Sequence, residues 1–158
     1  MRENHDKIII QVTPEEVWSV LTDMGKHAEW NPLIYHAEGE IKLGGKVRLS
    51  AKSGSIDMKY NCLVDKVKPN REFRWKWHIV LPFLLRGEHT FTIEPADENS
   101  IRLVNVEIFK GLLVPLFTKF LATDGKDSMV AMDKALKDRV EQSKRQSEQL
   151  YEAKLLGK

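Results

Sequence analysis

The sequence predicts an α+β domain in which an antiparallel sheet packs against one long C-terminal helix. Six segments with strand-like composition follow one another between residues 35 and 109, and tight turns join them. One more strand and two short helices precede these segments, and a long amphipathic helix follows them. Strands joined by tight turns run antiparallel, and a sheet covered on one face by a helix is an α+β layer architecture.

Length and charge indicate one domain with no surface dedicated to nucleic acid. The chain has 158 residues, the usual size of a single domain, and we expect a core over about 6–142 and a polar tail over 143–158. Its 25 basic and 23 acidic residues leave a net charge of only +2, whereas nucleic-acid-binding domains concentrate basic residues.

Composition also argues against membrane-spanning, secreted and metal-binding classes. No apolar run approaches the ~20 residues of a transmembrane helix, and the N-terminus lacks the apolar segment of a secretory signal. Cys62 is the only cysteine, and the five histidines are scattered. Cys62 therefore has no disulfide partner, and we expect it to be a small buried hydrophobe. We predict a soluble cytoplasmic protein without metal or cofactor.

The N-terminal part predicts one strand followed by two short helices. Asp6–Val12 has strand composition. Thr13 and Glu16 form a capping box around a proline at the first helical position, and the helix should end near Asp23–Gly25. A second helical turn over Lys26–Trp30 ends before Asn-Pro, because the residue before a proline avoids the α region.

The middle of the chain alternates apolar and polar residues with the period of a strand. The expected strands are Tyr35–Leu43, Lys46–Lys52, Ile56–Val67, Glu72–Val80, Gly87–Glu94 and Ile101–Phe109. Alternation is clearest in Glu72–Val80, where Phe73, Trp75, Trp77 and Ile79 share one face. Aromatic residues at this spacing are core residues, and in a fold with a cavity they would also line it.

The long helix is predicted from Pro115 to Gln142. At about 100° per residue its apolar residues form one broad face. That face carries Leu113, Phe117, Phe120, Leu121, Met132 and Leu136. The helix would be roughly 40 Å long, so it needs a sheet to lie across. Asp124 and Ser128 interrupt the apolar face around Gly125, which predicts a kink. This interruption is either a wet surface break or a polar part of a cavity wall.

Three segments resemble the START/Bet v 1-like (SRPBCC) superfamily, and more narrowly its bacterial polyketide cyclase/dehydrase and lipid-transport group. They are the opening strand with Thr13–Trp18, the Glu-Trp-Asn-Pro of residues 29–32, and Glu107–Leu113. The resemblance covers about residues 6–142. It implies the helix-grip fold, a curved seven-stranded antiparallel sheet wrapped around the C-terminal helix with a deep apolar cavity. Members bind lipids, sterols, polyketides or hormones, and some catalyse aromatisation or cyclisation. These motifs mark a fold rather than a reaction.

The turn between the last two strands predicts which residues lie opposite one another. Residues whose numbers sum to about 194 should pair, which places His89 near Asn105 or Glu107. The preceding loop places Trp77 beside His89. A register shift by one residue would instead expose His89 and Glu107 and bury Thr90 and Val106.

The resemblance implies a cavity that holds a hydrophobic small molecule such as a lipid, sterol or polyketide, and the placements above predict which residues line it. The candidate lining residues are Tyr60, Trp75, Trp77, Phe91, Leu103, Phe117, Leu121 and Met132, with His89, Glu107 and Asp124 as the polar minority. The alternative is an aromatase/cyclase-type enzyme that uses His89 and Glu107 as an acid–base pair. A third hypothesis is a protein-interaction module related to Hsp90-ATPase activators, which would show an exposed apolar patch and a filled interior without space for a ligand. Nothing in the sequence demands a reaction, which favours binding.

The loop Leu81–Leu85 is unusually apolar for a connection between strands. Such residues are costly in water, so they either fold over the core or form an apolar lip at the cavity mouth. A lip would allow transient membrane contact, with Phe117, Phe120 and Leu121 facing it. The polar tail is compatible with a monomer or a helix-mediated dimer, so the sequence leaves the oligomeric state open.

Overall fold

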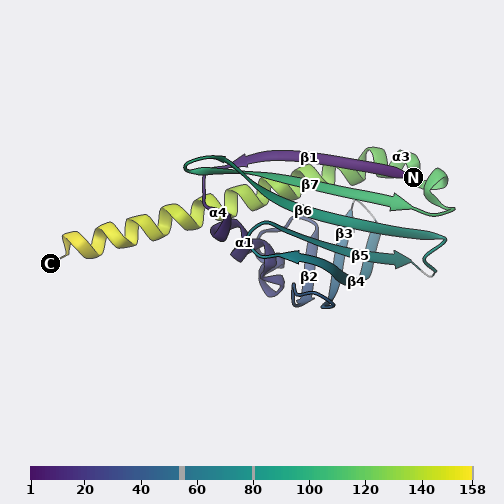
Figure 1. Ribbon diagram of the computed structural model, residues 1–158, viewed down its shortest axis with the longest axis horizontal. Coiled ribbons are helices and arrows are strands. Elements are labelled where there is room, and N and C mark those ends of the chain that lie inside the picture. The colour runs from purple at the N-terminus through teal and green to yellow at the C-terminus, as the bar shows by residue number, and fades with distance from the viewer. Residues whose placement is uncertain (54–55, 80, 158) are drawn as a thin grey trace.

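The computed structural model describes residues 1–53, 56–79 and 81–157, and it contains a curved antiparallel sheet that wraps around a long helix (Figure 1). The strands are β1 (Arg2–Ile10), β2 (Ile34–Gly39), β3 (Lys46–Ser53), β4 (Ile56–Lys68), β5 (Glu72–Ile79), β6 (Leu85–Asp97) and β7 (Ser100–Lys110). Their order across the sheet is β1-β7-β6-β5-β4-β3-β2. The predicted α+β helix-grip architecture is therefore confirmed, with its seven strands and its two short helices after β1.

The segment between β1 and β2 folds as the capping signals predict. It contains α1 (Pro14–Thr22), the 3₁₀ turn η1 (Met24–Lys26) and α2 (His27–Trp30). The Thr13 hydroxyl accepts from the Glu16 N–H at 3.3 Å, and the Glu16 carboxylate accepts from the Thr13 N–H at 2.7 Å. β1 begins at Arg2 rather than at residue 6, because its N-terminal half pairs with the far end of β7.

The predicted long helix is divided into α3 (Val114–Ala122) and α4 (Asp124–Leu156). The break falls at Thr123, whose φ of −105° and ψ of −83° are not helical, two residues before the expected kink at Gly125. α4 also continues through the polar tail and projects beyond the sheet (Figure 1). The tail is rich in Lys, Arg, Gln and Glu, which favour helix without needing a buried face.

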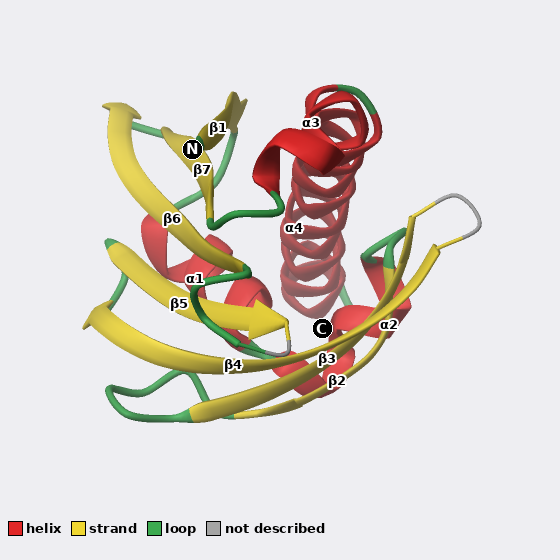
Figure 2. Cartoon of the chain, turned by 90° about the vertical axis from the view of Figure 1, so that its right-hand side faces the viewer, coloured by secondary structure: helices red, strands yellow, loops and turns green. Residues whose placement is uncertain are grey.

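α4 lies along the concave side of the sheet, and the core fills one part of the space between them (Figure 2). Phe73, Phe91 and Leu103 of the sheet and Leu136 of α4 are all 0–1% exposed. Burying a side chain of this size contributes about 1.5–3 kcal/mol relative to its exposed state, so these residues dominate the attachment of α4. Val80, expected as the last residue of its strand, lies outside the described residues.

Gly87 of β6 lies directly opposite Trp77 of β5 and makes room for its indole ring. A Cβ atom at Gly87 would lie 2.3 Å from Trp77 Cε2, closer than non-bonded atoms approach. The glycine thereby allows the indole to lie flat over the neighbouring strand.

We expect Gly87→Ala to lower the free energy of unfolding by about 1–3 kcal/mol, because the new methyl group must displace the packed Trp77 ring. Urea denaturation measures this change. Gly25→Ala is the matched control, because its Cβ would meet nothing closer than Asp23 Oδ1 at 3.8 Å, and its effect should stay within about 0.5 kcal/mol. Equal stability of the two variants would contradict the packing of Trp77 on Gly87.

Candidate functional site

A cavity of about 520 Å³ lies between the concave face of the sheet and the helices α3 and α4. Its walls come from the start of β2 and from β3, β4, β5, β6 and β7 on one side, and from α3 and the first turns of α4 on the other. Small-molecule sites typically measure about 300–1,000 Å³ and have mostly apolar walls with a few polar groups. The cavity has this size and this character.

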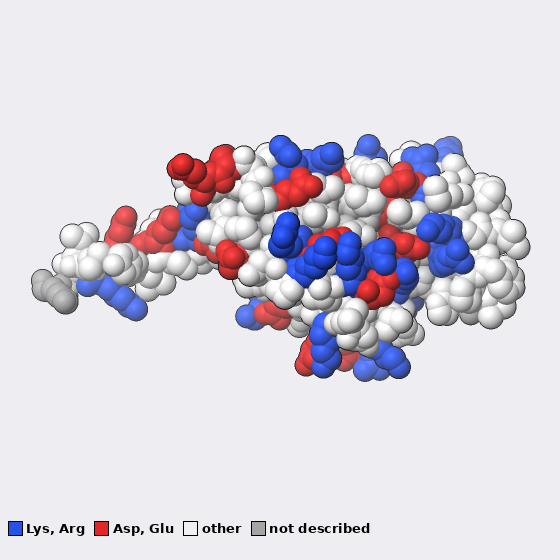
Figure 3. All heavy atoms as spheres, viewed as in Figure 1, with Lys and Arg blue, Asp and Glu red and all other residues white. Residues whose placement is uncertain are grey.

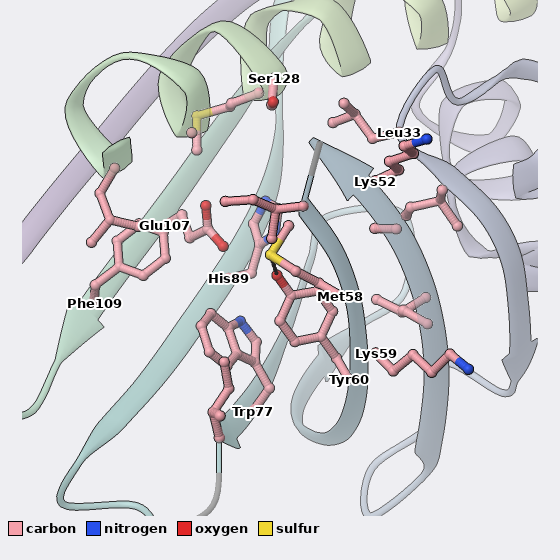
Figure 4. A pocket seen from close by; sticks show the side chains of 18 of the residues that line it. Leu33, Lys52, Met58, Lys59, Tyr60, Trp77, His89, Glu107, Phe109 and Ser128 are labelled. Atoms are coloured by element: carbon pink, nitrogen blue, oxygen red, sulfur yellow. Dashed lines mark hydrogen bonds between the residues drawn. The ribbon is translucent and has the colours of Figure 1, made fainter. Parts of the chain in front are cut away.

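Most of the residues expected to line a cavity do so. The structure brings together Tyr60, Trp75, Trp77, His89, Glu107, Phe117, Leu121 and Met132 on its wall. In Figure 4 the Glu107 carboxyl lies between Phe109 and His89, and Ser128 lies above them on α4. These positions agree with the alternation along the strands and with the apolar helix face.

Three of the expected lining residues were placed wrongly. Phe91 and Leu103 are 1% and 0% exposed and belong to the packed core, farther along the sheet than the cavity. Asp124 is exposed, and it accepts a hydrogen bond from the Thr123 hydroxyl. The break at Thr123 changes the helix phase, so that Gly125 of α4 faces the cavity in place of Asp124.

The register across the sheet places His89 directly opposite Glu107, the second of its two predicted partners. Both side chains lie on the cavity wall, so the alternative pleat, with these two exposed, is wrong. The prediction that Trp77 lies beside His89 is also wrong. Trp75 lies opposite His89, and its ring meets the imidazole edge-on at a centroid distance of 5.7 Å, whereas Trp77 lies opposite Gly87.

Several lining residues were missed, although the sequence carried a signal for some of them. Phe109 has the parity of Glu107, and Ile79 has the parity of Trp75 and Trp77, so both belong to the inward face. Leu49 and Ala51 line the cavity from β3, and their spacing of two residues places them on the same face of that strand. Ser128 was not missed: it interrupts the apolar helix face in the sequence, and it lies on the cavity wall, as the second interpretation of that interruption requires.

A chain of buried hydrogen bonds joins the cavity wall to α4. Asn105 Nδ2 donates to Asp133 Oδ1 at 2.8 Å, and the Asn105 Oδ1 lies 2.5 Å from His89 Nε2. Because the amide nitrogen is directed at Asp133, the amide oxygen is the atom that meets the imidazole, so His89 donates through Nε2. The neutral imidazole then keeps Nδ1 as an acceptor.

Burial shifts the pKa values of the polar groups in and below the cavity. It lowers the pKa of His89 to about 4, which the hydrogen bond to Asn105 partly opposes. It raises the pKa of Glu107 to about 7 and that of Asp133 to about 8, where the nearby Asp6 adds to the increase. At neutral pH the wall therefore offers an uncharged histidine acceptor and a carboxyl that is substantially protonated and able to donate.

Tyr60 and Cys62 remain protonated for the same reason. Burial raises the pKa of the Tyr60 phenol and raises that of the Cys62 thiol to about 12, and Glu107 contributes to both shifts. The Tyr60 hydroxyl donates to Met58 Sδ, and its ring packs on Trp77 at 4.9 Å between centroids. Cys62 is 2% exposed, which fits the predicted buried hydrophobe rather than a nucleophile.

Neither a metal cluster nor a membrane-spanning helix is found in the ranges that the structure describes. Within 1–53, 56–79 and 81–157, no three His, Cys, Asp or Glu side chains are grouped to hold a metal ion. No helix in these ranges combines the length and the apolar character needed to cross a bilayer.

The profile of the family described as polyketide cyclase/dehydrase and lipid transport matches residues 1–141. The chain belongs to this family. The matched region contains the whole sheet, α3 and most of α4, and it includes all the residues that line the cavity. No curated protein matches the sequence.

Solved structures of the same superfamily share the fold of this family member. The Zhui aromatase/cyclase from Streptomyces sp. R1128 has a TM-score of 0.75 at 17% identity, over 89% of this chain and 93% of that one. A START superfamily protein from Mycobacterium smegmatis has a TM-score of 0.69 at 20% identity, over 89% and 97%. Norcoclaurine synthase from Thalictrum flavum, in complex with dopamine and hydroxybenzaldehyde, has a TM-score of 0.68 at 15% identity, over 89% and 87%. At these identities the likeness shows the START/SRPBCC fold alone.

We expect the free energy of unfolding to fall by about 1 kcal/mol between pH 7 and pH 8, because in this range the folded state binds a proton that the unfolded state does not. The pKa of Asp133 rises from 3.8 to about 8 on folding, so in this window the folded chain holds a proton that the unfolded chain has lost. Asp133→Asn should remove most of this loss while it keeps the acceptor for Asn105.

Urea denaturation at each pH measures the effect, and Asp138→Asn, an exposed aspartate on the same helix, is the control. The control should retain the loss of the parent protein. An unchanged pH slope in Asp133→Asn would show that this carboxyl does not hold the proton.

Proposed function

We propose that the protein binds or transports a hydrophobic small molecule, of the lipid, sterol or polyketide-like class, inside the cavity. The observation that carries the proposal is the cavity of about 520 Å³ with aromatic and aliphatic walls. Transfer of an apolar molecule from water to such a surface is favourable at roughly 25 cal/mol per Å² of apolar area buried. Membership of a family described by cyclases and lipid transport supports the same function.

The polar groups of the cavity favour a ligand with one uncharged polar end. His89 and Glu107 are the paired polar groups on the inner wall, while Ile56, Ile79 and Phe117 lie at the solvent-exposed rim, each 40–43% exposed. A charged group moved next to this wall would lose its hydration without gaining an opposite charge. A hydroxyl or carbonyl oxygen could instead accept a hydrogen bond from the protonated Glu107 carboxyl, and a hydroxyl could also donate to Nδ1 of the His89 ring.

The cavity does not suit the third hypothesis, an interaction module with a filled interior. Such a module would pack Trp75, Trp77 and Met132 against one another and leave no space between sheet and helix. Here these three side chains line an open volume. The same geometry supports the first hypothesis.

Met132→Trp should abolish ligand binding while the fold is kept, because the larger ring extends into the space that the ligand would occupy. We expect affinity for an apolar fluorescent probe to fall at least about tenfold, a loss of about 1.4 kcal/mol. Native mass spectrometry of the purified protein, followed by organic extraction, would identify a bound molecule directly. Circular dichroism confirms that the variant is folded.

Val130→Trp is the matched control, because Val130 lies on the same helix, is 42% exposed and does not line the cavity. It should bind the probe as the parent protein does. Equal binding by Met132→Trp and Val130→Trp would place the probe outside the cavity. The proposed function would be contradicted if the native mass equalled that of the protein alone and if no lipid, sterol or aromatic polyketide changed the melting temperature.

A second candidate function, aromatase/cyclase-type catalysis, is favoured by one specific observation. His89 and Glu107 are direct partners across β6 and β7 and both line the cavity. Ring closure of a poly-β-keto chain needs a base that removes a proton next to one carbonyl and an acid that hydrogen-bonds another. The Nδ1 of neutral His89 could take the first role and the protonated Glu107 carboxyl the second. The low pKa of His89, about 4, makes it a weak base and places this candidate second.

If the protein is such an enzyme, His89→Ala should lower its turnover of a poly-β-keto substrate at least about 100-fold, because the base is removed. His78→Ala is the control, since His78 lies exposed on β5 and is not on the cavity wall. Chromatography of the cyclised product measures turnover. Equal rates in the two variants would exclude His89 as the base.

A further inference from the structure

One end of the molecule exposes a set of large apolar side chains. They are Leu81, Phe83, Leu112 and Leu116, with exposed fractions of 46%, 56%, 73% and 76%. We call them the apolar platform. In Figure 3 the outermost right-hand edge, beside α3 and the β5–β6 connection, shows no charged side chain, whereas both signs of charge appear just inside it and cover the middle of that face. Contiguous exposed apolar surface of this kind marks an interaction site.

The platform is built into the fold from two separate segments. The Leu112 N–H donates to the Phe83 carbonyl at 3.1 Å, and the Leu113 N–H donates to the Leu84 carbonyl at 3.0 Å. Gly111 has a φ of +130°, and a Cβ there would lie 2.3 Å from the Leu84 carbonyl oxygen. The two segments are therefore held together by backbone bonds and by close backbone packing, so their exposed side chains are fixed next to one another.

The helix that carries part of the platform is apolar on more than one face. Val114 and Leu121 of α3 are buried against the protein at 3% and 6% exposure, and Leu116 points away from it. A surface helix normally places polar residues on its outer side. α3 instead presents leucine to its surroundings.

The platform borders the mouth of the cavity. Ile79, at the rim, lies two residues before Leu81, and Phe117, also at the rim, follows Leu116 on α3. A molecule that leaves the cavity between these side chains therefore passes directly beside the platform.

Unpaired cations surround the platform and the rim. Arg86 follows the platform loop, Lys119 lies on α3, and Lys52 and Lys59 lie at the rim, all four exposed. Among the residues that the structure describes, no carboxylate forms an ion pair with any of the four. Lys110, by contrast, is paired with Glu88 at 3.0 Å.

Two exposed acids near this end accept hydrogen bonds from neighbouring hydroxyl groups, and among the described residues neither forms an ion pair with the four cations, although Asp57 lies opposite Lys52 across β3 and β4. Asp57 accepts from the Tyr35 hydroxyl at 2.8 Å, and Asp124 accepts from the Thr123 hydroxyl at 3.1 Å. Unpaired cations beside an exposed apolar surface are the combination that anionic lipid headgroups and acyl chains accommodate together.

We propose that this end of the protein docks on the surface of a lipid bilayer that contains anionic lipids. The apolar platform enters the boundary between headgroups and acyl chains, and the surrounding cations meet the headgroups. The cavity mouth then opens toward hydrocarbon, which gives an apolar ligand a route that avoids water. This last consequence rests on the proposed function, whereas docking itself does not.

A bilayer fits this surface better than a second copy of the chain does. In a two-fold symmetric dimer the same patch meets itself, so Arg86 and Lys119 of each copy would approach the same cations of the other. Like charges placed across an interface oppose association. An anionic surface removes this conflict.

Flotation with vesicles tests the proposal. The 158-residue protein should float with phosphatidylcholine vesicles that contain phosphatidylglycerol, and its partition coefficient should be at least about tenfold lower for phosphatidylcholine alone or at high salt. The double variant Leu112→Asp/Leu116→Asp should lose binding to the anionic vesicles by at least about tenfold, because charges cannot enter the acyl boundary. Both leucines are mostly exposed, so the fold should tolerate the change.

Leu156→Asp is the matched control, since Leu156 is 84% exposed at the opposite end of the molecule (Figure 1). It should float like the parent protein. The proposal is overturned if the parent protein does not float, or if the double variant floats equally well. It is also overturned if sedimentation shows a parent dimer that the double variant abolishes, because the platform would then join two copies.

A separate measurement keeps docking distinguishable from the cavity function. Neither Leu112 nor Leu116 lines the cavity, so in buffer without vesicles the double variant should bind the apolar probe as the parent protein does. Vesicle binding without any probe binding would support docking and contradict the proposed function. Probe binding without vesicle binding would support the proposed function and contradict docking.

Discussion

The contact between Asn105 and Asp133 separates the packed part of this fold from its open part. Toward the C-terminus of α4, Leu136 and Val140 are buried in the core, while Met129 and Met132, before Asp133, line the cavity. On β7, Leu103 lies in the core and Glu107 lies on the cavity wall, with Asn105 between them. This buried hydrogen bond therefore attaches the helix where apolar packing ends. Without such an attachment, a helix that lies over an empty volume would be free to collapse onto the sheet.

The same contact determines the chemistry of the cavity wall. Because Asn105 donates to Asp133, its oxygen is left for His89, and this orients the imidazole. Burial keeps Asp133 and much of Glu107 protonated at neutral pH, so the wall is polar without being charged. An ionised wall would favour water or a cation over an apolar guest. A protonated carboxyl next to a neutral imidazole can hold a hydroxyl or carbonyl group and still leave the rest of the cavity apolar.

Features that depend on short stretches of sequence were predictable, and features that depend on distant contacts were not. The capping box at Thr13 and the alternation that directs Trp75 and Trp77 inward are local, and they were predicted correctly. Asp124 was misplaced because one continuous helix phase was assumed, and the phase changes at Thr123. Asp133 was missed although it interrupts the buried face between Met132 and Leu136, because its partner Asn105 is 28 residues away. The pairing of Trp77 with Gly87 likewise depends on the length of an irregular loop.

The arrangement of core, polar wall and mouth along one axis gives the molecule a direction. The packed core closes the cavity beyond Asn105. The most exposed lining residues of the cavity, Ile79 and Phe117 among them, therefore lie at the end of the cavity away from the core. That end is also where the apolar platform lies and where the exposed cations Arg86, Lys119, Lys52 and Lys59 gather. An apolar side chain fixed in water by backbone hydrogen bonds, as at Leu112, gains nothing for the folded monomer. The position of Leu112 beside the cavity mouth is explained if this surface contacts an apolar environment.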